Sequence, residues 1–179
     1  MKKVAFWLAC LVALSLVLTA CTGGGGGDVV RVGVIAELTG DIPAVGASCK
    51  NAAEMAVQEI NDAGGLDIGG KKYKIELYIE DNAGKADQSA AAAQKLITQQ
   101  NVAAIIGPNA SRYAIPAAEV AESSKVVLIS PWSTNPKTTV VEKTGESKKY
   151  VFRAAFIDPF PGRVVAKFAL DSLQATKAA

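Results

Sequence analysis

Short hydroxyl-bearing side chains are concentrated in two loops that each follow an apolar run of residues. Residues 107–114 read G-P-N-A-S-R-Y-A, and residues 130–136 read S-P-W-S-T-N-P. The hydroxyls of Ser111, Ser133 and Thr134 can donate hydrogen bonds, and free backbone N–H groups at a helix start favour a carboxylate or phosphate. The two loops therefore indicate a site for a small anion. The structural alternative is that the first serine caps a helix and the other two residues shape a turn.

The apolar runs alternate with stretches of helical character, and this order indicates how the loops are positioned. It predicts an α/β fold, a doubly wound parallel sheet with helices on both faces. We expect strands at residues 29–36, 73–80, 102–106, 126–129 and 150–154, and helices at residues 47–63, 86–100, 115–124 and 161–175. Pro116 suits the first turn of the third helix. Because ligands of such sheets bind beyond the carboxyl ends of strands, the loops at 37–46, 107–114 and 130–136 are the candidate positions.

The composition excludes several classes of function. The protein has no histidine, so Ser-His-Asp catalysis and imidazole metal sites are absent. No G-x-G-x-x-G follows the first strand and no G-K-[ST] occurs, so we expect no nucleotide cofactor, no metal and no enzyme activity. Without Lys2 and Lys3, 17 basic residues face 17 acidic ones, so no basic patch for nucleic acid is expected. Glu80-Asp81-Asn82 suits a turn better than a calcium loop.

The N-terminus has the pattern of an export signal. Lys2 and Lys3 precede an uncharged apolar stretch at residues 4–18, and Leu18-Thr19-Ala20-Cys21 stands before five glycines. This pattern resembles the lipobox of bacterial lipoproteins, which implies cleavage before Cys21, acylation of its thiol and a membrane anchor outside the cytoplasm. The alternatives are an ordinary signal peptide with a chance cysteine, or an uncleaved anchor, although the run is shorter than the ~20 residues of a membrane span. Cys49 then has no partner for a disulfide.

Several segments resemble the branched-chain amino-acid-binding proteins of ABC importers. They are I-I-G-P-N-A-S at 105–111, V-V-L-I-S-P-W-S-T-N-P at 126–136, R-V-G-V-I-A-E-L-T-G near the start, and F-R-A-A-F-I-D near the end. The resemblance covers nearly all of residues 29–173. It implies a periplasmic-binding-protein-like fold, in which two α/β lobes close on an amino acid or small amide that a membrane permease then receives.

The resemblance also implies roles for individual residues. Ser111 matches the serine whose hydroxyl and amide hold the ligand α-carboxylate, and Thr134 matches the threonine that contacts both the carboxylate and the ammonium. Trp132 falls where a backbone carbonyl accepts from the ammonium. Val45 stands where leucine-type binders carry a large aromatic side chain. Residues 112–114 read R-Y-A, where the family has a serine-rich stretch. A carboxylate clamp is therefore expected, with altered side-chain specificity.

The resemblance divides the chain into an expected leader, tether and lobes. Residues 1–20 are the lipoprotein signal peptide, 21–28 the acylated cysteine and glycine-rich tether, 29–154 the first ligand-binding lobe, and 155–179 a hinge crossing and the start of an incomplete second lobe. Arg153 and Asp158 flank this crossing, where they line the cleft or hinge, or else form an ion pair or exposed loop charges.

The expected function is that of an extracytoplasmic solute-binding lipoprotein of an ABC importer, with an amino acid or small amide as ligand and permease subunits as partners. The alternative is a sensing domain of the same fold that feeds a signalling partner.

Overall fold

A computed structural model describes residues 28–177 and contains a sheet with the strand order β2-β3-β1-β4-β5-β6. β1 pairs in parallel with β3 on one side and with β4 on the other, and β4-β5-β6 continue the parallel arrangement. β2 pairs with β3 in antiparallel orientation. The strands are β1 (Val29–Ala36), β2 (Leu66–Ile68), β3 (Lys71–Asp81), β4 (Ala104–Ile106), β5 (Val127–Ser130) and β6 (Val151–Arg153).

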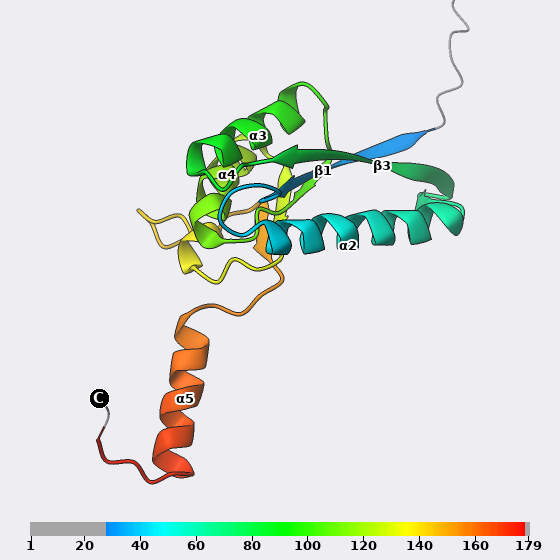
Figure 1. Ribbon diagram of the computed structural model, residues 1–179. Helices are drawn as coiled ribbons and strands as arrows, with labels where there is room; N and C mark the ends of the chain where they lie inside the picture. The colour runs from blue at the N-terminus through cyan, green and yellow to red at the C-terminus, as the bar shows by residue number, and fades with distance from the viewer. Residues whose placement is uncertain (1–27, 178–179) are drawn as a thin grey trace, which may run out of the picture.

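Helices cover both faces of the sheet, as Figure 1 shows. α2 (Pro43–Asp62) lies on one face, and α3 (Ala86–Thr98) and α4 (Ser111–Ser124) lie together on the other. Successive residues of β1 point to opposite faces. Ile35 joins the core under α3 and α4, whereas Val34 and Ala36 pack with Ala53 of α2. The predicted doubly wound α/β fold is confirmed. Among the described helices, none is both long enough and apolar enough to cross a membrane.

The third predicted helix starts four residues earlier than expected. α4 begins at Ser111, so Pro116 lies inside the helix and not in its first turn. Two further differences are the three-residue strand β2, which was not expected from the sequence, and the earlier start of α2 at Pro43. The extension of α4 matters most for the site, because it places Ser111 on the first turn of a helix.

The last helix, α5 (Pro159–Asp171), projects away from the sheet and its flanking helices (Figure 1). None of its residues is buried. Its exposed apolar side chains are Phe160, Val164, Val165, Phe168 and Leu170. The predicted leader, and the predicted lipid attachment at Cys21, lie outside the described residues.

Candidate functional site

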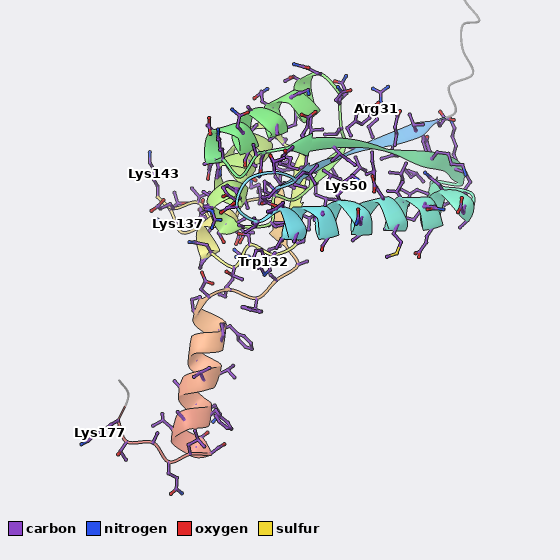
Figure 2. All side chains as sticks on the ribbon, viewed as in Figure 1. Arg31, Lys50, Trp132, Lys137, Lys143 and Lys177 are labelled. Carbon is purple, nitrogen blue, oxygen red and sulfur yellow. The ribbon has the colours of Figure 1, made fainter. Side chains whose placement is uncertain are left out.

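A hollow of about 360 Å³ lies beyond the carboxyl ends of β4, β5 and β6. Its wall is formed by Ala110, Ser111, Trp132, Thr134, Phe156 and Asp158. Trp132, which is labelled in Figure 2, belongs to the loop after β5, and 51% of its surface is exposed. Of the four predicted ligand-binding residues, Ser111, Trp132 and Thr134 therefore meet at one hollow. They come from two loops more than 20 residues apart because neighbouring parallel strands end at the same edge of the sheet.

The hollow lies beside the place where the direction of winding reverses. β1 has β3 on one side and β4 on the other, so the crossover after β1 runs to β3 and the crossover after β4 runs in the opposite direction, to β5. Ligands of open α/β sheets bind at such a point. Gly107 makes the close approach of the ends of β1 and β4 possible, because its φ is +87° and a Cβ there would lie 2.1 Å from the carbonyl oxygen of Ile35.

Glu37 connects the loop after β1 to the loop after β4. Its buried carboxylate accepts hydrogen bonds from the backbone N–H of Asn109 at 3.0 Å, the side-chain amide of Asn109 at 2.6 Å and the backbone N–H of Ala110 at 3.3 Å. These contacts hold the residues that lead into α4. Glu37 was not predicted from the sequence, since its partners lie more than 70 positions away along the chain.

The N-terminus of α4 faces the hollow without a side-chain cap. Its N-cap residue is Ala110, which has no side-chain group that could accept from the first-turn amides. The N–H of Tyr113 donates to the carbonyl oxygen of Ala110 at 2.9 Å, whereas the N–H groups of Ser111 and Arg112 have no partner within the helix and carry the positive end of its dipole. The proposed capping role of Ser111 is not observed, because Ser111 is the first helical residue and its Oγ is used elsewhere.

Ser111 Oγ accepts two hydrogen bonds from the loop after β5. The backbone N–H of Asn135 donates to it at 3.2 Å, and Ser133 Oγ lies at 3.0 Å. Ser133 itself is fully buried and does not line the hollow. Its hydroxyl lies between Ser111 and Thr138, whose Oγ1 is 2.6 Å away. The structure thus places the side chain of Ser133 behind Ser111, while Thr134 lies at the surface of the hollow.

Arg153, at the end of β6, holds the loop that carries Trp132 and Thr134. Its guanidinium donates to the carbonyl oxygens of Ser133 at 3.3 Å, Asn135 at 2.8 Å and Pro136 at 3.1 Å, and to Thr139 Oγ1. Burial lowers the pKa of Arg153, while the nearby Asp158 carboxylate acts in the opposite direction. No salt bridge of Arg153 is found among the described residues. The planar guanidinium group of arginine is suited to this role, because it can donate hydrogen bonds to several carbonyl oxygens at once.

We expect Arg153→Met to loosen this loop. Because methionine cannot donate to the carbonyl oxygens, the amide of Asn135 should exchange its hydrogen about tenfold faster, corresponding to ~1.4 kcal/mol of hydrogen-bonding free energy. Hydrogen exchange followed by NMR measures this directly. The amide of Val102, which donates to Leu96 on the α3 side, serves as the internal control. Arg153→Lys should give an intermediate rate, because an ammonium cannot reach all of these oxygens. Equal exchange at Asn135 in all three proteins would contradict the assigned role.

Asp158 and Phe156 complete the wall of the hollow on the side of α5. The sequence left three roles open for Asp158, namely a place in the cleft or hinge, an ion pair or an exposed loop charge, and it indicated no role for Phe156. The structure puts both on the hollow, and the backbone N–H of Asp158 donates to the carbonyl oxygen of Thr134 at 3.0 Å. One side of the hollow thus carries hydroxyl and amide donors, and the other carries a carboxylate.

A second group of polar residues borders the same edge of the sheet. The Tyr113 hydroxyl donates to Asp41 Oδ1 at 2.8 Å, and the Arg112 guanidinium pairs with Asp41 while lying 4.6 Å from the Tyr113 ring centre. The hydrogen bond from Tyr113, together with the charge of Arg112, keeps the pKa of Asp41 below its ordinary value. The side chain of Arg112 therefore binds to the loop after β1, and the carboxylate of Asp41 partly balances its charge.

Val45 lines a different, more apolar hollow of about 460 Å³ between α2 and the ends of β4 and β5. Cys49 lies on its wall as a free thiol, and burial raises its pKa. Within residues 28–177, no group of three or more His, Cys, Asp or Glu side chains could hold a metal ion.

Comparisons with known proteins find one matching family and several relatives. The profile of the family described as periplasmic binding protein matches residues 29–179. The chain is 35% identical over 145 residues to the Leu/Ile/Val-binding protein BraC3 of Rhizobium johnstonii, a match that covers 81% of this chain and 37% of that protein. A relative described as a Leu/Ile/Val-binding protein homolog in Brucella melitensis is 31% identical over 150 residues, or 84% of this chain and 38% of the relative.

Solved structures agree with this assignment. The branched-chain amino acid transporter substrate-binding protein LivJ of Streptococcus pneumoniae, in complex with isoleucine, matches with a TM-score of 0.70 and 32% identity over 83% of this chain and 40% of that one. The leucine-binding protein LivK of Thermotoga maritima matches with a TM-score of 0.66 and 34% identity over 82% of this chain and 38% of that one. The chain thus spans about 40% of the length of the proteins that it matches.

Proposed function

Because this chain belongs to the periplasmic binding protein family, we propose that it captures an α-amino acid, branched-chain or related, by its carboxylate for an ABC importer. The relatives it matches are described as solute-binding proteins and not as enzymes, and the family implies a location outside the cytoplasm. Attachment to a membrane through an acylated Cys21 and delivery of the ligand to permease subunits belong to the same proposal.

The observation that carries the proposal is the meeting of Ser111 and Thr134 at the uncapped N-terminus of α4. A carboxylate in the hollow would accept from the Ser111 hydroxyl, the Thr134 hydroxyl and the first-turn amides of α4. Hydrogen bonds to a charged partner contribute more than neutral ones, and the helix dipole adds to the attraction. No neutral group would use all of these donors equally well.

The remaining walls suit the other parts of an amino acid. Asp158 provides a negative charge for the ammonium group, and the carbonyl of Trp132 is a further acceptor in the loop. Phe156 offers apolar surface for an aliphatic side chain. Because Asp158 and Phe156 precede α5, ligand contacts to them would bring that side of the hollow toward the sheet, which is the direction of lobe closure about a hinge.

Calorimetric titration of the protein expressed from the complete reading frame tests the proposal. Leucine, isoleucine and valine are compared with isobutylamine, isopentylamine and leucinamide, which keep the side chain but lack the carboxylate. We expect the amino acids to bind and the amines to bind at least about 100-fold more weakly, because two or more charge-assisted hydrogen bonds are lost. Equal affinities for isopentylamine and leucine would refute a carboxylate-directed site.

A further inference from the structure

Three hydroxyl groups form a row that runs from the protein interior to the hollow. Thr138 Oγ1 lies 2.6 Å from Ser133 Oγ, and Ser133 Oγ lies 3.0 Å from Ser111 Oγ. Thr138 and Ser133 have no exposed surface, whereas Ser111 lines the hollow. Only the last member of the row can therefore touch a ligand.

The buried end of the row determines which oxygen donates to which. A hydroxyl has one proton to donate and two lone pairs that accept. Within the described part of the chain, Ser133 is the one hydrogen-bond partner of Thr138 Oγ1. If Ser133 donated to Thr138, the Thr138 proton would be buried without an acceptor, which costs more than an unused lone pair. Thr138 therefore donates to Ser133.

The direction of this first hydrogen bond determines the direction of the others up to the hollow. Ser133 accepts the proton of Thr138, so its own proton is directed to Ser111 Oγ. Ser111 also accepts from the backbone N–H of Asn135 at 3.2 Å. Both lone pairs of Ser111 are then occupied, and its proton is left for the hollow. Ser111 is consequently a donor to the ligand and has no capacity left to accept from one.

We propose that Thr138 and Ser133 act as positioning residues that orient the Ser111 hydroxyl and so make the site select a carboxylate over a group that donates. This inference rests on the proposed function and extends it to residues that do not touch the ligand. A carboxamide presents N–H donors where a carboxylate presents acceptors only. Its NH₂ group would meet a hydroxyl proton at Ser111, which is a repulsive arrangement that discriminates between the two ligands.

The backbone around the row is anchored independently of the ligand. The Lys148 ammonium donates to the carbonyl oxygens of Lys137 at 3.1 Å and Thr138 at 3.2 Å, and it pairs with Glu119 at 2.6 Å. Arg153 holds the carbonyl of Ser133 at 3.3 Å. These contacts hold the backbones of Ser133 and Thr138, and the hydrogen bonds of the row fix the direction of the hydroxyl protons. Hydrogen bonds in such a chain also strengthen one another.

Ser133→Ala tests the inference, with Thr138→Ser, which keeps all three hydroxyls, as the control. With alanine at 133, Ser111 Oγ regains a free lone pair and can accept from the NH₂ group of leucinamide. Affinities for leucine and leucinamide are measured by calorimetry on the protein from the complete reading frame. In Ser133→Ala we expect leucine to bind about tenfold more weakly, leucinamide to change less, and the leucine-to-leucinamide ratio to fall, as expected when a charge-assisted hydrogen bond is weakened. Thr138→Ser should keep the ratio of the unmodified protein.

A general loss of stability would weaken both ligands alike, so the ratio distinguishes orientation from mere packing. An unchanged ratio in Ser133→Ala, or equal ratios in Ser133→Ala and Thr138→Ser, would overturn the inference. In Thr138→Val the Ser133 proton still has Ser111 Oγ as its acceptor, so we expect a smaller fall of the ratio, which comes from the lost strengthening along the row. An unchanged ratio in Thr138→Val would overturn the part of the inference that concerns Thr138, and this variant also covers the case in which Ser133→Ala does not fold.

Neutron diffraction from deuterium-exchanged crystals reads the direction of the row without any ligand. We expect the deuterium between Thr138 and Ser133 to be bonded to Thr138, and the Ser111 deuterium to face the hollow. The opposite order would overturn the inference. If titration finds no amino-acid binding while the deuterium positions are as expected, the proposed function fails and the assigned hydroxyl direction still holds.

Discussion

Replacing Ser111 and Thr134 together with alanine should reduce amino-acid affinity at least about 100-fold, because each lost hydrogen bond to a charged carboxylate costs ~1.5–3 kcal/mol. Both side chains lie on the wall of the hollow, and Ser111 has its proton directed toward it. The alanine pair would leave only the first-turn amides of α4 to meet the carboxylate. Ser111→Ala also removes the acceptor of the Asn135 amide, so we expect it to be the more damaging of the two single changes.

Calorimetry on the protein from the complete reading frame measures the effect of the double replacement. A matched control is the pair Thr98→Ala and Ser123→Ala, since both hydroxyls lie on exposed helical turns and bond to local carbonyls only. The control should bind as the unmodified protein does. A double variant of Ser111 and Thr134 that keeps its affinity within about twofold, which is less than one ordinary hydrogen bond, would rule out this hollow as the carboxylate site.

Gly107→Ala should destabilise the folded chain more than any surface replacement. At this position φ is +87°, and an added Cβ would lie 2.1 Å from the carbonyl oxygen of Ile35 in the neighbouring strand β1. Backbone strain and a clash with rigid backbone act together here, and we expect the free energy of unfolding to fall by more than about 3 kcal/mol. The ends of β1 and β4 would separate, and with them the loops that Glu37 connects.

Gly70→Ala separates the two causes of that loss. Its φ of +84° is nearly that of Gly107, but no atom lies within 4 Å of the position of its Cβ. We expect a loss of about 1 kcal/mol from strain alone. Urea unfolding followed by circular dichroism compares the variants with the unmodified chain. Equal losses for the two glycines would show that the approach of β1 to β4 does not depend on the missing side chain at 107.

The centre of the fold could be predicted because the second half of β1 is buried on both faces. The run at Val29–Ala36, apolar apart from Arg31, has the same bounds in sequence and structure, since such runs need no periodicity to be recognised. β2 has three residues, all exposed, and offers no comparable pattern. The start of α4 was predicted too late because Pro116 is a strong first-turn signal, yet nothing in the preceding residues stops a helix.

The residues that build the hollow were only partly predictable. Ser111 and Thr134 could be brought together because strand ends in a parallel sheet share one edge. Ser133 and Thr134 are adjacent and chemically alike, so composition does not indicate that one is buried and the other faces the hollow. The contacts of Glu37 with Asn109 and of Arg153 with the loop after β5 depend on three-dimensional packing, for which a single sequence contains no local signal.

The segment between β6 and α5 has a mechanical consequence, because it supplies Phe156 and Asp158 to a hollow whose other wall is formed by the start of α4 and the loops after β4 and β5. The unburied helix α5 and this wall are covalently continuous, so swinging the helix would carry two wall residues with it while Ser111 stays in place. A ligand that spans both walls would favour one orientation of α5 over the others. Ligand binding in the hollow and the orientation of α5 are then thermodynamically linked, so the orientation of the helix would report whether the hollow is occupied.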